Sequence, residues 1–368
     1  MQPQRFSQSI YTDNKSPENY SIGVLKGEGV GSHIIDCSLK LLLYLPQNFD
    51  ISYGGAIGKL SEKECGESLT KEVIDFCQNV FSKEGAILAG PGGSRFVYEL
   101  RREFDLFCKV VPLKFYPEIY HANRLKENFA AGTSITLLRE NASGIYQGQE
   151  SLDRSKKDEV WQMTFSYKKS EVEKILTVAA KIAQNSRKKM LVIVKDGGLC
   201  EFSKFWRKIA QQTAEEYHVE CEFANIDYAT YYMIHYAQSL DVIVASNLFG
   251  DILADLGSVI MGGRGISFSG NFSQHKAAVY QTNHGSAYDL QGQNKANPVG
   301  QFYSLAMLLR ESFHLDKEAF FIEEAVRRSW EQGTWTFDVA PHDSSFVTTD
   351  KMTESVSRNL QKIVEEHK

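Results

Sequence analysis

The chain has 368 residues, enough for two domains or for one large α/β unit. Hydrophobic residues make up 42% and charged residues 24%, and the net charge of −5 offers no basic field for nucleic acid or for an anionic membrane surface. No apolar run approaches the ~18 residues of a membrane-spanning helix. The six cysteines are scattered, with no C-x-x-C pair, which is typical of reduced thiols in a cytoplasmic protein.

The start of the chain combines a polar segment with a first strand and helix. Residues 1–20 are polar and lack the apolar core of a signal peptide, so a flexible N-terminal tail is expected. The apolar run 21–25, the glycine-rich turn 27–31 and the helical spacing that follows predict strand, turn and helix. The turn reads G-x-G-x-G, so a dinucleotide-binding loop and a glycine turn that merely lets the helix pack both remain open.

Further strands alternate with helical patterns along the chain. Strands are predicted over residues 86–89, 134–140 and 190–196, the last two ending in charged residues. A helix is predicted before the last of these, with Ser170 as N-cap, Glu173 at the capping-box position and an apolar stripe behind them. This alternation predicts an α/β fold, although composition shows no domain boundary.

The segment 247–255 carries the most chemistry. It follows a predicted strand over residues 242–245, and Asp251 and Asp255 lie four residues apart, on one face of a helix. Two such carboxylates repel each other unless a cation lies between them, and a hard divalent ion with oxygen ligands would serve. The alternative is a solvated helix face that happens to carry two acids.

Other candidates are weaker when each is taken alone. Lys195 ends a predicted strand, where a solvated lysine is common and a catalytic lysine needs a partner. Arg101 and Arg139 offer the bidentate geometry that suits a carboxylate, although surface arginines are also common. Tyr146 is one of 17 tyrosines and indicates nothing by itself.

Together these pieces resemble the isopropylmalate/isocitrate dehydrogenase family, the metal-dependent β-decarboxylating dehydrogenases. The resemblance runs from about residue 21 to the last helix. Its most specific motifs are N-L-F-G-D-I-L-A-D at 247–255, H-G-S-A-Y-D at 284–289 and A-N-P at 296–298. Supporting motifs are G-E-G-V-G at 27–31, R-E at 139–140 with G-I-Y at 144–146, and F-W-R at 205–207.

The resemblance implies a particular architecture. It implies an isopropylmalate/isocitrate dehydrogenase-like fold, in which two α/β domains have a cleft between them, and not a Rossmann fold. Residues 21–108 and 263–368 are expected to form a large domain with the cofactor-binding loops. Residues 109–262 are expected to form a small domain with the dimerisation and metal-binding elements.

The resemblance also implies roles for the metal and for catalysis. Asp227, Asp251 and Asp255 match the carboxylates that hold Mg²⁺ or Mn²⁺, and Asp227 would reach into the partner's site in a homodimer with shared active sites. Lys195 matches the lysine that assists deprotonation of the substrate hydroxyl. Tyr146 matches the tyrosine that protonates carbon after CO₂ leaves.

Substrate and cofactor roles follow in the same way. Arg101 and Arg139 match arginines that clamp substrate carboxylates. The adenosine-side cofactor loop is matched by His284, Gly285, Ser286, Ala287, Asp289 and Asn297. A carboxylate at Asp289 accepts hydrogen bonds from a ribose 2′-OH and repels a 2′-phosphate, so NAD is expected rather than NADP.

The chain departs from the family's pattern at the substrate. Where the family has Asn-x-Arg-Pro with a third clamping arginine, this chain has Lys109-Val110-Val111-Pro112. A charge-assisted hydrogen bond is worth about 1.5–3 kcal/mol, so its loss weakens dicarboxylate binding roughly a hundredfold unless Lys109 enters the site. After Lys195, the family's Ala-Asn-Val is replaced by Asp-Gly-Gly at 196–198, which could pair Asp196 with the lysine.

Two functions are compatible with these observations. The first is NAD-dependent oxidative decarboxylation of a malate-like 2-hydroxy acid of the 3-isopropylmalate, isocitrate, homoisocitrate or tartrate class, with specificity altered at Val111. The second is a catalytically weak paralogue that acts as a regulatory or partner subunit of a homologous dehydrogenase. The intact lysine, tyrosine and three aspartates favour the first. Neither function involves a nucleic-acid or membrane partner.

Overall fold

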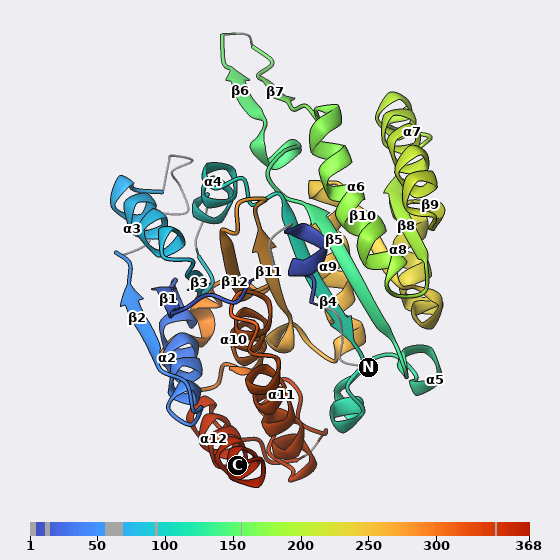
Figure 1. The fold of residues 1–368 in the computed structure, drawn as a ribbon. Coiled ribbons are helices and arrows are strands. Elements are labelled where there is room, and N and C mark those ends of the chain that lie inside the picture. Colours follow the sequence, from blue (N-terminus) through green and yellow to red (C-terminus); the bar gives the residue numbers. More distant parts are fainter. Residues whose placement is uncertain (1–4, 12–14, 56–68, 93–94, 156, 343) are drawn as a thin grey trace.

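A mixed ten-stranded sheet runs through the computed structural model, which describes residues 5–11, 15–55, 69–92, 95–155, 157–342 and 344–368 (Figure 1). The strand order is β2-β1-β3-β12-β11-β4-β5-β10-β8-β9. These strands are β1 (Tyr20–Leu25), β2 (Phe49–Tyr53), β3 (Ala86–Ala89), β4 (Cys108–Lys114), β5 (Ser134–Glu140), β8 (Lys189–Val194), β9 (Glu220–Asn225), β10 (Val242–Ala245), β11 (Phe268–Phe272) and β12 (Ala278–Thr282). A separate hairpin consists of β6 (Gln149–Asp153) and β7 (Val160–Thr164).

The sheet is parallel at both ends and antiparallel in the middle. Strands β2, β1, β3 and β12 pair in parallel, as do β5, β10, β8 and β9, while β11 and β4 join the two sets through antiparallel pairs. All residues of β3 and β10 are buried, because helices cover both faces of these parallel strands. The α/β fold class and the strands predicted at 21–25, 86–89, 134–140 and 242–245 are therefore confirmed.

The helices pack on both faces of this sheet (Figure 1). They are α1 (Ser7–Ile10), α2 (Gly31–Leu42), α3 (Lys71–Ser82), α4 (Phe96–Glu103), α5 (Glu127–Ala130), α6 (Lys169–Gln184), α7 (Cys200–Tyr217), α8 (Ile226–His235), α9 (Asn247–Met261), α10 (Val299–Glu311), α11 (Asp316–Glu331) and α12 (Thr349–Glu366). Short 3₁₀ turns are η1 (Pro117–Ala122), η2 (Ile145–Gln147), η3 (Ala237–Ser239), η4 (Arg264–Ile266) and η5 (Tyr288–Leu290). Within the described chain, no helix combines the length and the apolar character that crossing a membrane requires.

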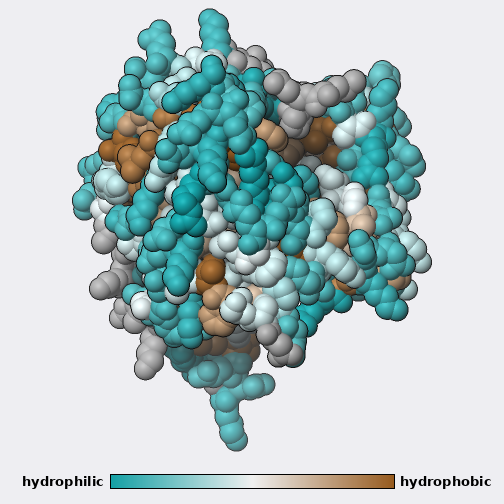
Figure 2. Space-filling model, turned by 90° about the horizontal axis from the view of Figure 1, so that it is seen from below, coloured by the Kyte–Doolittle hydropathy of each residue, from teal (hydrophilic) through white to brown (hydrophobic). Residues whose placement is uncertain are grey.

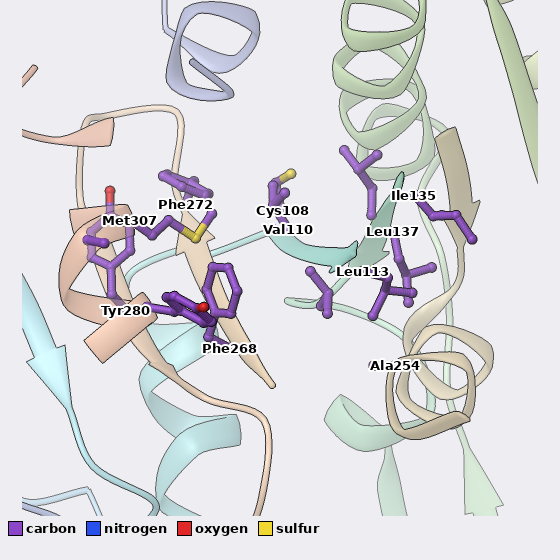
Figure 3. Close-up of a cluster of buried hydrophobic side chains, with 14 of the residues drawn as sticks. Cys108, Val110, Leu113, Ile135, Leu137, Ala254, Phe268, Phe272, Tyr280 and Met307 are labelled. Carbon is purple, nitrogen blue, oxygen red and sulfur yellow. The ribbon is translucent and has the colours of Figure 1, made fainter. Parts of the chain in front are cut away.

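One hydrophobic core spans the antiparallel middle of the sheet. Figure 3 shows buried side chains of β11, β12 and α10 on one side and of β4, β5 and α9 on the other. Strand β4 belongs to both groups, since Val110 pairs with Gly270 of β11 and with Leu138 of β5. The expected boundary at residues 108/109 thus falls inside a shared strand, and the division into two domains stays a proposal.

Two local predictions are wrong within the described residues. The segment expected as a flexible tail contains α1, where the Ser7 amide donates to the buried Glu311 carboxylate at 2.8 Å. Helix α6 begins two residues earlier than expected, because the carboxylate of Glu171, not Glu173, accepts the Lys168 amide at 2.7 Å. Lys168 is therefore the N-cap, and Ser170 lies in the first helical turn.

Exposed apolar side chains gather away from the core. The β6–β7 hairpin projects from the top of the view in Figure 1 and exposes Leu152, Val160 and Trp161. By contrast, the face shown in Figure 2 is largely hydrophilic, with hydrophobic residues visible only in limited areas. These three side chains are the apolar surface that the hairpin presents to solvent, and an isolated two-stranded hairpin is marginally stable in water.

Candidate active site

The candidate substrate site forms where β4, β5 and β10 lie next to one another. Arg139, near the end of β5, pairs in register with Ala245 on β10 and with Lys109 on β4. Helix α9 begins two residues after Ala245, at Asn247. A strand end that leads into a helix start is where open α/β sheets place ligands.

Arg139 is the centre of a buried polar network. Its Nε and Nη2 both donate to Oδ1 of Asn247, at 2.9 and 2.8 Å, and its Nη1 donates to Asp251. Asn247 is itself buried and donates from Nδ2 to the Ser143 carbonyl at 2.6 Å. The guanidinium is thus fixed by a charge-assisted pair and a neutral acceptor.

Tyr146 approaches the same carboxylate from η2. Its hydroxyl donates to Oδ2 of Asp251 at 2.8 Å, and its ring lies 5.4 Å from the Arg139 guanidinium carbon. Burial, together with the hydrogen bond to Asp251, raises the pKa of Tyr146. Burial also raises the pKa of Asp251, but the positive charge of Arg139 and the Tyr146 bond outweigh it, so the net shift is downward. The phenol therefore keeps its proton beside an ionised carboxylate.

Two more buried cations lie in this region. Arg101 and Lys109 have relative exposures of only 5% and 4%. Burial, followed by the charges of Arg101 and Arg139, lowers the pKa of Lys109 well below its usual range, while Asp251 and Asp255 raise it. Burial and the charge of Arg139 likewise lower the pKa of Arg101. Lys109 is therefore within electrostatic reach of the predicted clamp and of both α9 aspartates.

Glu140 is a buried acid next to Arg139. Its carboxylate accepts the amides of Ala142 and Ser143 at 3.0 and 3.1 Å. Burial nonetheless raises its pKa to about 8, because the backbone hydrogen bonds and the Arg139 charge only partly offset the loss of water.

The α9 carboxylates fit a hard divalent cation. Asp251 and Asp255 are oxygen donors one helical turn apart, as predicted. Each carboxylate is engaged by one cation of its own chain: Asp251 by Arg139, and Asp255 by Nη2 of Arg264 at 3.1 Å. Both acids offer oxygen ligands of the kind that Mg²⁺ or Mn²⁺ prefers, and Asp255, whose partner Arg264 is exposed, is the more easily released of the two.

Lys195 and Asp227 form a separate pair. Nζ of Lys195 donates to Oδ1 of Asp227 at 2.9 Å, and this contact lowers the pKa of the exposed carboxyl group. Among the described residues, Asp227 does not join Asp251 and Asp255 in one metal-sized cluster. The reason is topological: Asp227 follows β9, and β8 lies between β9 and β10.

Asp196, which follows Lys195 and departs from the family's pattern, binds another residue rather than the lysine. Asp196 accepts Nε and Nη2 of Arg207 at 3.0 and 2.6 Å. The anticipated Asp196–Lys195 pair is therefore wrong, because Arg207 on α7 provides a bidentate partner.

The predicted cofactor loop surrounds a cavity of about 420 Å³. His284, Gly285, Ala287, Asp289 and Asn297 line it, as do Arg264 and Asp338. Burial lowers the pKa of His284, which favours the neutral ring. Of the predicted set, only Ser286 does not line the cavity.

Ser286 instead ties the loop to the glycine turn. Its carbonyl accepts the Val30 amide at 2.9 Å. A Cβ on Gly29, which has φ +57°, would lie 1.9 Å from that same oxygen. A glycine at position 29 is therefore required for close packing of the turn against the predicted cofactor loop.

A His/Cys/Asp cluster anchors the other end of this loop. His33, Cys37 and Asp350 place possible ligand atoms within 4.8 Å of one another. His33 Nε2 lies 3.0 Å from Oδ1 of Asp350, whose Oδ2 accepts Nδ2 of Asn294 at 2.9 Å. Burial raises the pKa of the Cys37 thiol. Hydrogen bonding accounts for the cluster, which joins α2, α12 and the cofactor loop.

Three residues of the site were not assigned roles from the sequence. Asn247 stood inside a recognised motif, and its place directly after a strand was a usable signal. No sequence signal indicated Arg264 or Asp338, because only the folded chain brings these two residues to the cavity. Asp338 accepts Oγ1 of Thr336 at 2.6 Å and Nδ2 of Asn297 at 3.1 Å, which positions the cavity wall.

A cluster of buried basic side chains, a helical carboxylate pair and a cavity on one α/β sheet are features of a binding site for a small anionic molecule. The chain belongs to the isocitrate/isopropylmalate dehydrogenase family, whose profile matches residues 21–356.

Named relatives agree with this membership. The chain is 33% identical over 353 residues to a 3-isopropylmalate dehydrogenase of Priestia megaterium, covering 91% of this chain and 94% of that protein. It is 30% identical over 363 residues to a 3-isopropylmalate dehydrogenase of Aquifex aeolicus, with 94% and 98% covered. The crystal structure of isocitrate dehydrogenase from Methylococcus capsulatus superimposes with a TM-score of 0.81 at 26% identity, covering 93% of this chain and 99% of that chain.

The family and these names indicate an oxidative, decarboxylating dehydrogenase that acts on a small molecule. Enzymes of this family generally use a divalent metal ion and NAD(P).

Proposed function

We propose that the protein is an NAD- and Mg²⁺- or Mn²⁺-dependent dehydrogenase of a malate-like 2-hydroxy acid. The nicotinamide, when bound, would accept a hydride from C2 of the substrate, and the β-keto acid so formed would lose CO₂. The observation that carries this proposal is the group of three buried basic side chains, Arg101, Lys109 and Arg139, next to Asp251.

The charge of this group calls for an anionic ligand. Asp251 engages Arg139, whereas no salt bridge among the described residues engages Arg101 or Lys109. An uncompensated buried charge is destabilising by several kcal/mol, so a ligand with two carboxylates binds here with a large electrostatic gain. Lys109 lies two residues before Val111 on the same face of β4, and a bound carboxylate would favour its protonated form, which supplies the positive charge that Val111 lacks.

A second cavity has room for a substituent at C3 of the substrate. It has a volume of about 320 Å³ and is lined by Tyr98, Ile145, Tyr146, Trp161 and Met163, with Arg95 and Glu150. Tyr146 belongs both to this cavity and to the Asp251 network. The mostly apolar and aromatic lining favours a hydrocarbon substituent over a third carboxylate.

Preference for NAD is supported by the wall of the other cavity. Asp289 is exposed at the rim of the 420 Å³ space, where its charge opposes a 2′-phosphate. We expect purified protein to reduce NAD faster than NADP at equal concentration. A measured preference for NADP would contradict this assignment.

The chain's own groups divide the chemistry between them. Asp251 and Asp255, with Asp227 of the other protomer, would hold the divalent ion, which would lower the pKa of the substrate hydroxyl and stabilise negative charge on the substrate oxygen. Lys195, whose Nζ donates to Asp227, would assist deprotonation of the hydroxyl once the ion has taken Asp227 from it. Tyr146, whose raised pKa keeps it protonated, delivers a proton to carbon after decarboxylation.

A homodimer with shared sites completes this assignment. Asp227 and Lys195 lie together at the start of α8, apart from the α9 aspartates. The same region exposes Tyr228 and Tyr231 on α8 and Ile252 on α9. A partner that covers these apolar side chains brings its own Lys195–Asp227 pair to the Arg139–Asp251 network. The free cysteines among the described residues are consistent with the proposed cytoplasmic location.

A substrate panel tests the proposal. 3-Alkyl- and 3-arylmalates, tartrate, isocitrate and homoisocitrate are supplied with NAD and Mn²⁺, and the absorbance of reduced cofactor is followed. Turnover of a 3-substituted malate is the expected result. A folded protein that turns over nothing would favour the alternative of a regulatory subunit, and it should then change the kinetics of a co-purified homologous dehydrogenase.

A further inference from the structure

Arg264 lies between the carboxylate pair and the cofactor cavity. It begins η4, shortly after α9 ends at Met261, and the C-cap Gly262, with a φ of +110°, turns the chain between them. Its Nη2 donates to Oδ2 of Asp255 at 3.1 Å, and the two side chains are 59% and 53% exposed. An exposed pair of this kind contributes about 0–1 kcal/mol, so Arg264 can exchange partners at little cost.

The same arginine is the cation of the cavity wall. Among the residues that line the 420 Å³ cavity, Asp289 and Asp338 are acidic, His284 has a lowered pKa, and Arg264 alone is basic. A dinucleotide carries a diphosphate, and guanidinium is the side chain best suited to phosphate oxygens. A diphosphate in this cavity therefore has one strong partner in the wall.

The position of Arg264 on the rim is fixed by its neighbour. A Cβ on Gly265 would lie 2.4 Å from Oδ2 of Asp338 and 2.8 Å from Cβ of Asn297. The backbone therefore packs directly against the cavity wall, while the Arg264 side chain extends from it. The backbone of η4 is thus held in place, while the exposed guanidinium of Arg264 can change its position.

We propose that Arg264 couples the divalent ion to the dinucleotide by changing partners. In the free protein it neutralises Asp255. When a divalent ion occupies Asp251 and Asp255, Arg264 is repelled from the carboxylate and turns to the cofactor diphosphate. The inference rests on the proposed function, because it places the ion at these aspartates and the dinucleotide in this cavity.

The divalent ion and the diphosphate should each strengthen the binding of the other. A bound ion releases the arginine for the diphosphate, and a bound diphosphate removes the arginine from the path of the ion. Each ligand therefore tightens the other by the same factor, as linkage requires. Adenosine, which lacks the diphosphate, binds the cavity without sensing the ion.

Binding measurements on the full-length protein test this directly. Calorimetric titrations with NADH, ADP-ribose and adenosine are run with and without Mn²⁺, on the wild type, Arg264→Leu and Arg264→Lys. Arg358→Leu, on an exposed part of α12, is the matched control for loss of one arginine.

The expected pattern is specific to the diphosphate. Mn²⁺ tightens ADP-ribose binding at least about five-fold in the wild type and in Arg358→Leu. In Arg264→Leu, Mn²⁺ leaves ADP-ribose affinity unchanged, and adenosine affinity equals that of the wild type. Arg264→Lys keeps part of the coupling. Without nucleotide, Arg264→Leu binds Mn²⁺ a few-fold more tightly by electron paramagnetic resonance, because no cation competes for Asp255.

The outcomes separate this inference from the function on which it rests. If Arg264→Leu shows the same Mn²⁺ effect on ADP-ribose as the wild type, Arg264 is a surface ion pair only and the inference fails alone. If the wild type binds neither NADH nor ADP-ribose, the cofactor assignment fails and this inference fails with it.

Discussion

Lys109 lies directly opposite Arg139 on the neighbouring antiparallel strands β4 and β5, and both side chains are buried. Like charges in cross-strand positions are destabilising, so this arrangement does not serve stability. The arrangement is explained if Lys109 and Arg139 together bind an anion. The altered Lys-Val-Val-Pro segment is then a different clamp rather than a missing one.

Replacing Lys109 should separate binding from stability. Lys109→Met removes a buried cation with a side chain of similar length, so we expect the free energy of unfolding to rise by about 1–3 kcal/mol. We expect KM for the acid substrate to rise about a hundredfold, with NADH affinity unchanged. Denaturant unfolding and steady-state kinetics measure both. Lys114→Met, on the exposed end of the same strand, should change neither quantity.

Restoring the family pattern should require two substitutions. Val111 is fully buried in the core, so Val111→Arg alone adds a cation beside Lys109 and lowers stability by several kcal/mol. The double variant Lys109→Asn/Val111→Arg recreates Asn-x-Arg-Pro and should raise kcat/KM for 3-isopropylmalate above that of either single variant. If the double variant loses activity on every acid tested, the pocket has been rebuilt around another ligand.

Tyr146→Phe tests the proton donor. The substitution removes the hydroxyl that donates to Asp251 but keeps the ring near Arg139. We expect kcat to fall about 10²–10⁴-fold, the usual contribution of a general acid, and the melting temperature to change little. Tyr98→Phe is the control, because its ring lies only 5.0 Å from that of Tyr146. Equal losses in the two variants would argue for packing rather than proton transfer.

Mixing inactive subunits tests the shared site. Asp227→Asn and Asp251→Asn should each be inactive as homodimers. In a heterodimer of the two, one site receives an intact Asp251 and the partner's intact Asp227, so activity should return after subunit exchange. Mixing Asp251→Asn with Asp255→Asn should restore nothing, because both residues serve the same site. Recovery in neither mixture, with dimers shown by light scattering, would mean that sites are not shared.

Glu140 should make stability depend on pH. Its folded pKa of about 8 lies above the ordinary value of 4.5, so the folded state holds the proton more firmly. Its contribution is complete below the ordinary pKa and is lost as pH rises through about 8. The free energy of unfolding of the wild type should thus fall between these values relative to Glu140→Gln, by a few kcal/mol at most. Glu354→Gln, on an exposed position of α12, should follow the wild-type curve.

The sequence was sufficient for what depends on local pattern. Apolar runs located the strands around Leu25, Ala89 and Ala245, and the four-residue spacing placed Asp251 and Asp255 on one face of α9. Family motifs located the cofactor loop, most of which lines one cavity. These features are encoded by residues close together in the chain.

What the sequence did not provide depends on contacts between distant segments. Asp196 and Lys195 are neighbours in the chain, yet Arg207 and Asp227 are their partners in the fold. Whether Lys109 enters the site depended on its register with Arg139. The helix start at Lys168 was missed because either of two glutamates could have capped it, and only the fold selected one.

The shared strand β4 has a mechanical consequence. Lys109 is paired on one side with Asn271 of β11 and on the other with Arg139 of β5, at the seam where the two parallel halves of the sheet meet. If the two parallel halves of the sheet rotate relative to each other, strand β4 has to twist. If the acid substrate binds to Lys109 as proposed, it is held on the strand that joins the two halves, and its binding would resist their relative rotation.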